Sequence, residues 1–381
     1  MFRVSGTIMA EIITIDADEA YIAVGARAAS ALDRGGVVAF PTETVYGVGA
    51  RADLPAAVRR LRRLKERTDG KPFTVHIPER DHVPTYVPEL PGLGRRLIRK
   101  GWPGPITLLF RLSDPSAAPV LNRGVATLAG EIYRGGEIGL RCPDHDLARR
   151  ILAGVAGPVV AASANRAGST PACTASEVLR ELGDDIDLLV DGGTTQFGRP
   201  SSVVRVGENR YEVLREGVYD ERMLRRLASM NFLFVCTGNT CRSPMAAGMF
   251  RRMLARRLSC APSELPNYHI EVRSAGTFAG GGSPSSPEAI EVMRRREIDI
   301  TAERSTRLSP ELIEQADRIY VMTRSHAKAV TAIVPSAEEK TQLLSEDGDI
   351  DDPIGAGVSV YESYAAKIEK ALTARLGEVE L

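Results

Sequence analysis

The feature that most constrains the fold is an apolar run that leads through a short polar loop into a helix start. The run Phe232–Val235 has no polar alternation, which is typical of a strand covered on both faces. The loop opens with Cys236, and Ser243-Pro244 beyond it is a favourable helix start. We therefore expect a strand whose end is joined by a tight loop to a helix N-terminus.

We expect this loop to bind a phosphate group. Loop N–H groups and the positive end of a helix dipole converge there, and the guanidinium of Arg242 can hold two phosphate oxygens. The same positive potential should lower the pKa of Cys236, which makes this thiol the candidate nucleophile. The alternative is a buried core cysteine and a surface arginine, but a Cys-x5-Arg-Ser spacing between a strand and a helix argues against it.

The composition is that of an ordinary globular protein of two to three domains. The 381 residues are 43% hydrophobic and 26% charged, and the 49 basic and 49 acidic side chains cancel, so no overall charge indicates a nucleic-acid or membrane partner. Five cysteines without regular spacing argue against a disulfide framework. No apolar run approaches the roughly 18 residues that a membrane span needs. We expect a cytoplasmic protein with no membrane partner.

We place the domain boundary near Gly217. A strand-like stretch, Tyr211–Leu214, ends there, and a polar helical stretch, Asp220–Ala228, leads to the next apolar strand. The expected organisation is a first domain over residues 1–217, a connector helix over 218–230 and a second domain over 231–381.

Polar and basic side chains of the first half gather where predicted strands begin or end. Lys65, Arg67 and Lys71 come just before the strand that carries His76, and cations placed there can clamp a triphosphate. Ser163 and Asn165 close another buried strand, a common position for ligand-facing groups. On base rates, His76 alone would be a structural histidine.

Residues from about 10 to 217 resemble the Sua5/YrdC family of L-threonylcarbamoyladenylate synthases. The family's Lys-x-Arg and Ser-x-Asn marks correspond to Lys65-Glu-Arg67 and Ser163-Ala-Asn165, in frame with Pro-Thr-Glu-Thr-Val-Tyr-Gly and Trp-Pro-Gly-Pro-x-Thr. The resemblance implies an α+β fold with a twisted mixed sheet around a basic cavity. It also implies a nucleotidyltransferase that makes threonylcarbamoyl-AMP and pyrophosphate from L-threonine, bicarbonate and ATP, for N6-threonylcarbamoyladenosine synthesis in tRNA.

The same resemblance assigns the substrate contacts. Mg²⁺ is expected to arrive with ATP, and a transferase of the tRNA-modification pathway to receive the product. One departure is that relatives usually have asparagine at the position of Lys71. The residues implied to bind threonine are Thr44, His76, Arg141, Ser163 and Ser201, and those implied to bind ATP are Lys65, Arg67, Lys71, Asn165 and Arg215.

Residues from about 231 to 381 resemble the low-molecular-weight protein tyrosine phosphatase family. The resemblance rests on the Cys-x5-Arg-Ser loop, Ser274-Ala-Gly-Thr277, the segment Met322–His326 and Asp351-Asp352-Pro353. It implies a three-layer α/β/α domain with a parallel sheet, and alternating helices and strands in this half favour the same architecture.

The implied mechanism needs no metal. Cys236 takes the phosphoryl group, Arg242 holds its oxygens, Asp352 protonates the leaving group and later activates water, and Ser243 donates a hydrogen bond to the sulfur. Asp351 is the local competitor for the acid role, and a solvated acidic turn is the alternative for both. No metal site formed by protein side chains is expected in either half.

Thr240 bears on the substrate of the phosphatase. Tyrosine phosphatases of this family usually carry a bulky aliphatic residue there, whereas its protein-arginine phosphatases carry threonine, so phosphoarginine is favoured over phosphotyrosine. Arsenate reductases of the same fold need cysteines well downstream, and none follows Cys260. Cys241 is a candidate partner for a reversible disulfide with Cys236.

The sequence therefore predicts a bifunctional enzyme. The alternative is that one half has lost catalysis and serves as a nucleotide-, RNA- or phosphoprotein-binding module that regulates the other half. The presence of Cys236, Arg242 and Asp352 together disfavours an inactive phosphatase.

Overall fold

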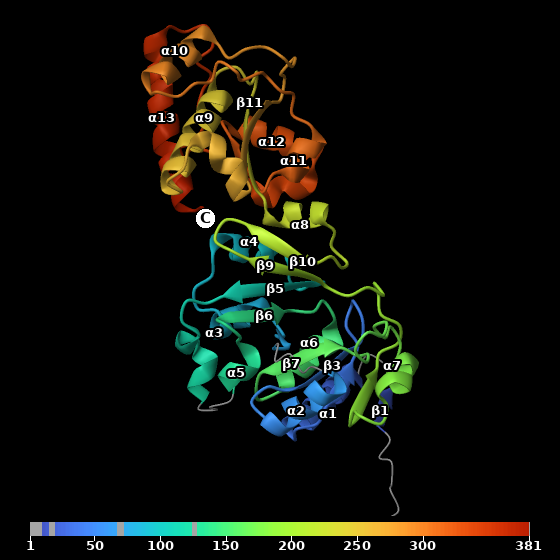
Figure 1. The fold of residues 1–381 in the computed structure, drawn as a ribbon. Coiled ribbons are helices and arrows are strands. Elements are labelled where there is room, and N and C mark those ends of the chain that lie inside the picture. The colour runs from blue at the N-terminus through green and yellow to red at the C-terminus, as the bar shows by residue number, and fades with distance from the viewer. Residues whose placement is uncertain (1–9, 15–19, 67–71, 124–127, 381) are drawn as a thin grey trace, which may run out of the picture. The chain divides into compact units, whose positions relative to one another are not determined.

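The computed structural model describes residues 10–14, 20–66, 72–123 and 128–380. The chain divides into two compact units, Met1–Ala228 and Ser229–Leu381 (Figure 1). Arg67 and Lys71 lie outside the described residues.

The first unit is built on a mixed sheet that contains, among its described residues, ten strands. Some neighbouring strands pair in parallel, such as β4 with β6, and others pair antiparallel, such as β3 with β7. In sheet order the strands are β1 (Glu11–Thr14), β8 (Leu188–Asp191), β2 (Val38–Phe40), β3 (Gly47–Arg51), β7 (Val159–Ser163), β4 (Thr74–His76), β6 (Glu137–Arg141), β5 (Ile106–Arg111), β9 (Ser202–Val206) and β10 (Tyr211–Arg215).

Helices cover this sheet on both faces. Side chains of β2 alternate between two apolar clusters: Val38 and Phe40 pack with two helices, α1 and α6, while Ala39 joins the larger core on the other face. The helices of this unit are α1 (Ala20–Asp33), α2 (Pro55–Leu64), α3 (Val83–Tyr86), α4 (Gly92–Gly101), α5 (Leu128–Ile132), α6 (Asp146–Gly154), α7 (Ala175–Leu182) and α8 (Glu221–Ala228).

The helix expected as a connector, α8, packs on the first unit. Leu224 and Ala228 are buried in the larger core of that unit, and Arg96 Nε of α4 donates to the Ala228 carbonyl at 3.0 Å. A capping box begins α7, where the side chains of Thr174 and Glu177 each accept a hydrogen bond from a backbone N–H group.

The second unit has a parallel sheet in the order β12-β11-β13-β14. Its strands are β11 (Met230–Cys236), β12 (Ile270–Gly276), β13 (Arg318–Val321) and β14 (Thr341–Leu343), and its helices are α9 (Arg242–Arg257), α10 (Pro287–Arg295), α11 (Pro310–Gln315), α12 (Arg324–Ile333) and α13 (Val358–Gly377). Short 3-10 helices complete the two units at Arg80–His82, Pro115–Ala117, Pro119–Arg123, Pro262–Tyr268 and Pro335–Lys340.

Strand β11 is buried on both faces, as its apolar run predicts. Phe232 and Phe234 face the cluster formed with α9, α10 and α13, where both rings pack edge-on against Phe250. Leu233 and Val235 face the opposite cluster, which includes side chains of α11 and α12. The mixed sheet of the first half and the three-layer parallel architecture of the second are therefore confirmed.

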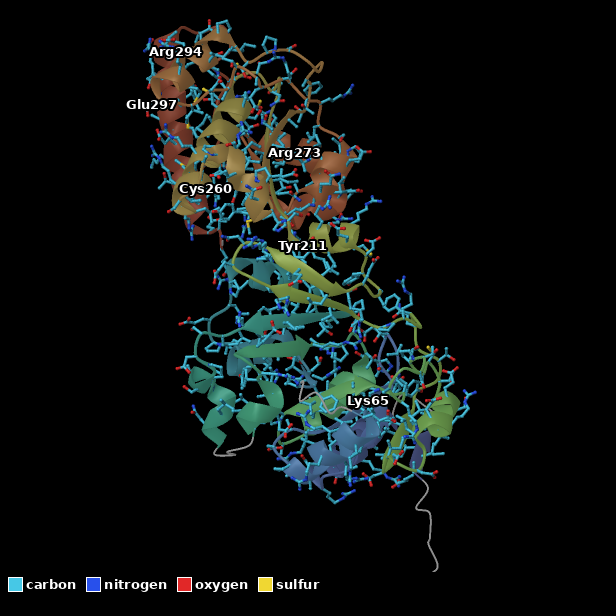
Figure 2. All side chains as sticks on the ribbon, viewed as in Figure 1. Lys65, Tyr211, Cys260, Arg273, Arg294 and Glu297 are labelled. Atoms are coloured by element: carbon cyan, nitrogen blue, oxygen red, sulfur yellow. The ribbon has the colours of Figure 1, made fainter. Side chains whose placement is uncertain are left out.

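Charged side chains lie mainly outside these cores (Figure 2). Arg273 on β12 and Arg294 on α10 are half and nearly three-quarters exposed, and each forms an ion pair with a neighbouring glutamate. Such exposed pairs contribute little to stability because water screens their charges, so the cores carry most of the stability. Among the described residues no helix is long and apolar enough to cross a membrane.

We predict that Phe234→Ala destabilises the protein by about 3–5 kcal/mol, because a fully buried ring is lost and a cavity is left. Ile333→Ala at the end of α12, where the side chain is 41% exposed, should change the free energy of unfolding by less than about 0.5 kcal/mol. Urea unfolding of both variants checks this. Equal effects of the two substitutions would contradict the packing described for β11.

Candidate active sites

The loop between β11 and α9 joins a strand end to a helix N-terminus, an arrangement suited to binding an anion. Cys236 is the last residue of the strand and Arg242 is the first residue of the helix. Cys236 is 2% exposed, its Sγ lies 3.0 Å from Ser243 Oγ, and the backbone N–H of Asn239 donates to it at 3.2 Å. The structure thus places Ser243 against the sulfur, as the sequence suggests.

The expected lowering of the Cys236 pKa is wrong for this conformation. Burial raises the pKa of the thiol, and this effect exceeds the lowering by Ser243, by the Arg242 charge and by the Asn239 amide. The opposing groups that the sequence predicts are therefore present. What the sequence could not reveal is how completely the sulfur is removed from water.

Asn239 organises the loop, and sequence reasoning missed it. It adopts φ +56°, a left-handed conformation that asparagine tolerates better than most residues. Its Nδ2 donates to Ser243 Oγ and Ser274 Oγ, both at 2.8 Å, and its Oδ1 accepts from the Thr306 amide at 2.7 Å. The sequence signal that could have identified Asn239 is an asparagine directly after a glycine in a predicted tight loop.

Arg242 is buried beside this loop and reaches the predicted acid. Its Nη1 donates to the Ile350 carbonyl at 2.9 Å, and its Nη2 donates to Thr237 Oγ1 at 3.3 Å and to the carboxylate of Asp352. Its Nε is buried and has no partner among the described residues. A bound oxyanion would supply the missing acceptor.

Of the two neighbouring aspartates, Asp352 is the one brought to the pocket. Its carboxylate pairs with Arg242 and remains 34% exposed, so it is open to a ligand from outside. Asp351 is exposed, and no hydrogen bond or ion pair links its side chain to a described residue.

His326 was quoted only as part of a motif, yet it contacts the loop directly. Its Nε2 lies 2.9 Å from Thr237 Oγ1 and its Nδ1 lies 2.8 Å from Thr323 Oγ1. Burial, aided by the Arg242 charge, lowers the pKa of His326 to about 4, so the imidazole is neutral at physiological pH.

Cys241 and Thr240 close the loop on the side of α13. The Cys241 thiol lies 3.1 Å from the hydroxyl of Tyr361, 3.5 Å from Ser286 Oγ and 3.6 Å from Thr240 Oγ1. Both Cys236 and Cys241 are free cysteines here. The sequence did not indicate Tyr361, which lies 120 residues further along the chain.

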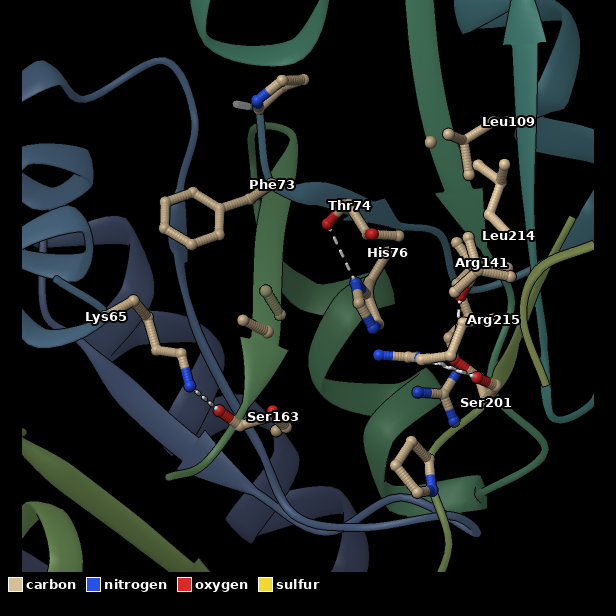
Figure 3. Close-up of a pocket in the computed structure, with 18 of the residues that line it drawn as sticks. Lys65, Phe73, Thr74, His76, Leu109, Arg141, Ser163, Ser201, Leu214 and Arg215 are labelled. Atoms are coloured by element: carbon tan, nitrogen blue, oxygen red, sulfur yellow. Dashed lines mark hydrogen bonds between the residues drawn. The ribbon is translucent and has the colours of Figure 1, made fainter. Parts of the chain in front are cut away.

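The first unit contains a cavity of about 1160 Å³ that is lined largely by residues of its sheet and of the adjoining loops (Figure 3). Lys65 and Ser163 lie on one side of the view, and His76, Arg141, Arg215 and Ser201 converge on the other. The predicted residues that line the cavity are Lys65, His76, Arg141, Ser163, Asn165, Ser201 and Arg215. Thr44 does not line it but contacts Arg141.

Lys65 is held at the end of β7. Its Nζ donates to the Ser163 carbonyl at 2.9 Å, to the Asn165 carbonyl, and to Asn165 Oδ1 at 3.2 Å. Ser163 Oγ also donates to Asn165 Oδ1, at 2.6 Å. These three residues form one network, although sequence reasoning divided them between threonine and ATP.

A second network surrounds Arg141. Its Nη2 donates to Thr44 Oγ1 at 2.6 Å and to Glu43 Oε1 at 3.0 Å. Glu43 is a buried carboxylate that sequence reasoning missed, although it lies within the quoted Pro-Thr-Glu-Thr run. His76 is nearby: burial and the Arg141 charge lower its pKa to about 3, so the ring is neutral, and its Nδ1 lies 3.1 Å from the Thr74 carbonyl.

Arg215 and Ser201 complete the cationic side. Arg215 Nη2 donates to the Ser201 carbonyl at 2.8 Å, and Ser201 Oγ lies 3.0 Å from Thr107 Oγ1. Burial and the neighbouring Arg141 lower the pKa of Arg215. The expected ATP residue Arg215 therefore lies with the expected threonine residues.

Carboxylates are scarce at this cavity. Among its described lining residues the sole acidic side chain is Glu137, which pairs with Arg205 at 2.7 Å. No group of three or more histidine, cysteine, aspartate or glutamate side chains that could hold a metal ion occurs among the described residues. The cavity therefore suits an anionic ligand.

Two protein-family profiles match separate parts of the chain. Residues 30–217 match the Sua5/YrdC family profile, described as "Telomere recombination", and residues 231–380 match the profile described as "Low molecular weight phosphotyrosine protein phosphatase".

Relatives of the first half are synthases. The chain is 36% identical over 178 residues to a threonylcarbamoyl-AMP synthase of Chromohalobacter salexigens, covering 47% of this chain and 90% of that protein. It is 33% identical to the Bacillus subtilis enzyme of the same name over 50% of this chain and 53% of that protein, so it spans about half the length of that relative.

Relatives of the second half are phosphatases. The chain is 39% identical to a protein-arginine-phosphatase of Geobacillus stearothermophilus, over 38% of this chain and 93% of that protein. The solved structure titled "YwlE arginine phosphatase from Geobacillus stearothermophilus" is similar at 36% identity and a TM-score of 0.34, over 39% of this chain and 91% of that one. The chain therefore belongs to the Sua5/YrdC family in its first half and to the low-molecular-weight phosphotyrosine protein phosphatase family in its second half.

Proposed function

We propose that the chain carries two enzymes, of which the first makes L-threonylcarbamoyl-AMP and pyrophosphate from L-threonine, bicarbonate and ATP. The observation that carries this proposal is the cavity that gathers Lys65, Asn165, Arg141 and Arg215 from distant segments of the chain. A relative of this half is named a threonylcarbamoyl-AMP synthase. The residues that touch each substrate are part of the proposal.

The chemistry requires alignment and charge stabilisation, not an enzyme nucleophile. The threonine amine and bicarbonate form a carbamate with loss of water, and a carbamate oxygen then attacks the α-phosphorus while the bond to pyrophosphate breaks. Lys65 stabilises the charge that develops on the departing pyrophosphate, and Arg141 holds the threonine carboxylate. His76, neutral and buried, presents an acceptor nitrogen to the threonine amine or hydroxyl. Thr44, Ser163 and Ser201 orient the amino acid.

We expect Mg²⁺ to bind in this cavity only as part of its complex with ATP. Glu137 is engaged by Arg205, so the described lining residues offer the metal no free carboxylate, and the ion would be held by ATP phosphates. When bound it neutralises phosphate charge. Arg67 and Lys71 stay predicted ATP ligands. The product is a reactive mixed anhydride, which suits direct transfer to a tRNA-modifying transferase in the cytoplasm.

We further propose that the second half hydrolyses phosphorylated protein side chains. The carrying observation is the buried, unpaired Nε of Arg242 beside the Cys236 loop, because a phosphate oxygen supplies the missing acceptor. The Cys236 sulfur attacks phosphorus, the bond to the side chain breaks, and Asp352 gives its proton to the leaving atom. Water activated by Asp352 then attacks the thiophosphate, and Ser243 stabilises the departing sulfur.

Phosphoarginine is the favoured substrate. Thr240 carries a hydroxyl at the loop, where a bulky aliphatic side chain would give a phenyl ring better apolar contact, and a relative of this half is named a protein-arginine-phosphatase. Two apolar side chains near the pocket, Phe278 and Ile354, are 84% and 72% exposed. Phe278 N donates to the Thr237 carbonyl of the loop, and Ile354 follows Asp352 closely, so both are available to a protein substrate.

We predict that Lys65→Ala lowers threonine-dependent pyrophosphate release by about 100- to 1000-fold, the usual effect of removing one donor to developing charge. Arg59→Ala on the exposed face of α2 is the matched control and should retain the wild-type rate. Pyrophosphate release with ATP, bicarbonate and threonine measures both variants. A full rate in Lys65→Ala would contradict the cavity assignment.

We predict that Cys236→Ser abolishes phosphate release, by at least about a thousandfold, because the nucleophile is lost. Cys260→Ser, a half-buried cysteine outside the loop, should retain activity. Phosphate release from phosphoarginine and from phosphotyrosine is the measurement. If Cys236→Ser stays active on either substrate, the phosphocysteine mechanism is wrong.

We predict that Thr240→Ile shifts the ratio of kcat/KM for phosphotyrosine over phosphoarginine upward by about 10- to 200-fold, the range that one apolar contact provides. Thr237→Val, on the Arg242 side of the loop, serves as the comparison and should weaken both substrates alike. A wild-type preference for phosphotyrosine, unchanged by Thr240→Ile, would refute the phosphoarginine assignment.

A further inference from the structure

Glu43 is a buried charge that the proposed mechanism does not use. Its side chain is 1% exposed, and Oε1 accepts a hydrogen bond from Arg141 Nη2 at 3.0 Å. Its Oε2 is also buried and has no partner among the described residues. Arg141 lines the cavity and Glu43 does not, so the carboxylate contacts the guanidinium from outside the cavity lining.

A buried ion pair of this kind contributes little to the net free energy of folding. Removing two charges from water costs several kcal/mol per ion, and replacing a buried pair by apolar residues is often neutral or stabilising. The cost is greater when one carboxylate oxygen remains unpaired. Stability alone therefore does not explain the pair, and a role in the neighbouring cavity explains it better.

The hydrogen bonds of Arg141 indicate that this role is to orient its guanidinium. Nη2 is held by Thr44, Glu43 and, at 3.3 Å, Thr42. Nε is buried and has no hydrogen-bond partner among the residues that the structure describes. Nη1 forms no hydrogen bond with any described residue, and Arg141 lines the cavity, so Nη1 is the nitrogen left for a ligand. Fixing Nη2 from outside the cavity lining sets the direction of Nη1.

Glu43 also balances charge. Arg141 and Arg215 line the same cavity, and the charge of Arg141 contributes to lowering the pKa of Arg215. A buried anion paired with Arg141 reduces the repulsion between the two cations before any ligand binds. The carboxylate of an amino acid can then bind without competing with Glu43 for the same nitrogen.

We propose that Glu43 is a positioning residue for threonine recognition, which orients the Arg141 guanidinium so that Nη1 receives the substrate carboxylate. The inference rests on the proposed synthase function and deepens it. Glu43 acts through Arg141, and ATP, which is proposed to bind through Lys65 and Asn165, is not affected by it.

The test is Glu43→Gln in the full chain. The variant keeps the shape of the side chain and removes its charge, so we expect the KM for threonine to rise about tenfold, equivalent to about 1.4 kcal/mol, with kcat and the KM for ATP unchanged. Threonine binding measured by calorimetry should weaken by the same factor. Glu131→Gln, which breaks the partly buried pair with Arg62 outside the cavity, is the matched control and should change neither constant.

Three further variants separate positioning from folding. Glu43→Asp keeps the charge with a shorter reach and should lie between wild type and Glu43→Gln; it also serves if Glu43→Gln does not fold. Arg141→Gln should weaken threonine binding more than Glu43→Gln does, and adding Glu43→Gln to it should cause no further weakening. Thermal unfolding of each variant monitors the fold.

The outcomes are distinct. An unchanged or lower KM for threonine in Glu43→Gln, or an equal rise in the KM for ATP, overturns the positioning role. If the wild-type chain binds threonine but releases no pyrophosphate, the proposed synthase function fails while the calorimetric comparison still decides the role of Glu43.

Discussion

Both candidate sites contain a buried guanidinium that is paired with a carboxylate of the same unit, an arrangement suited to binding an oxyanion. Arg242 pairs with Asp352, and Arg141 pairs with Glu43. A desolvated cation binds an anion strongly, but it is costly to bury alone. The two folds meet this constraint differently, because Asp352 is one-third exposed whereas Glu43 is sealed inside.

Much of the architecture could be predicted because it rests on local patterns. The unbroken apolar run at Phe232–Val235 required cover on both faces, and the structure provides one cluster on each side. The strand, the loop and the helix start follow one another in sequence, so their meeting needs no knowledge of distant segments. Ser163 and Asn165 at the end of a buried strand were found in the same way.

The rest of each site depends on partners far apart in the chain. Asn239 is fixed by Ser274 and Thr306, and Cys241 by Tyr361, and no local pattern reports these contacts. Glu43 was overlooked because a carboxylate in a loop usually faces water, and burial depends on the whole sheet. The pKa of Cys236 was misjudged for the same reason: the stabilising groups could be read from the motif, but the depth of the sulfur could not.

The ion pair between Arg242 and Asp352 affects the order of events when a substrate binds. In this conformation Asp352, the proposed proton donor, is held as the counterion of Arg242. In the proposed mechanism, a phosphate that binds Arg242 brings a second anion to the same guanidinium and weakens its hold on the carboxylate. Entry of the substrate and release of the donor are then coupled. Water or a neutral side chain brings no competing charge, so in this mechanism only a group that carries negative charge frees the donor.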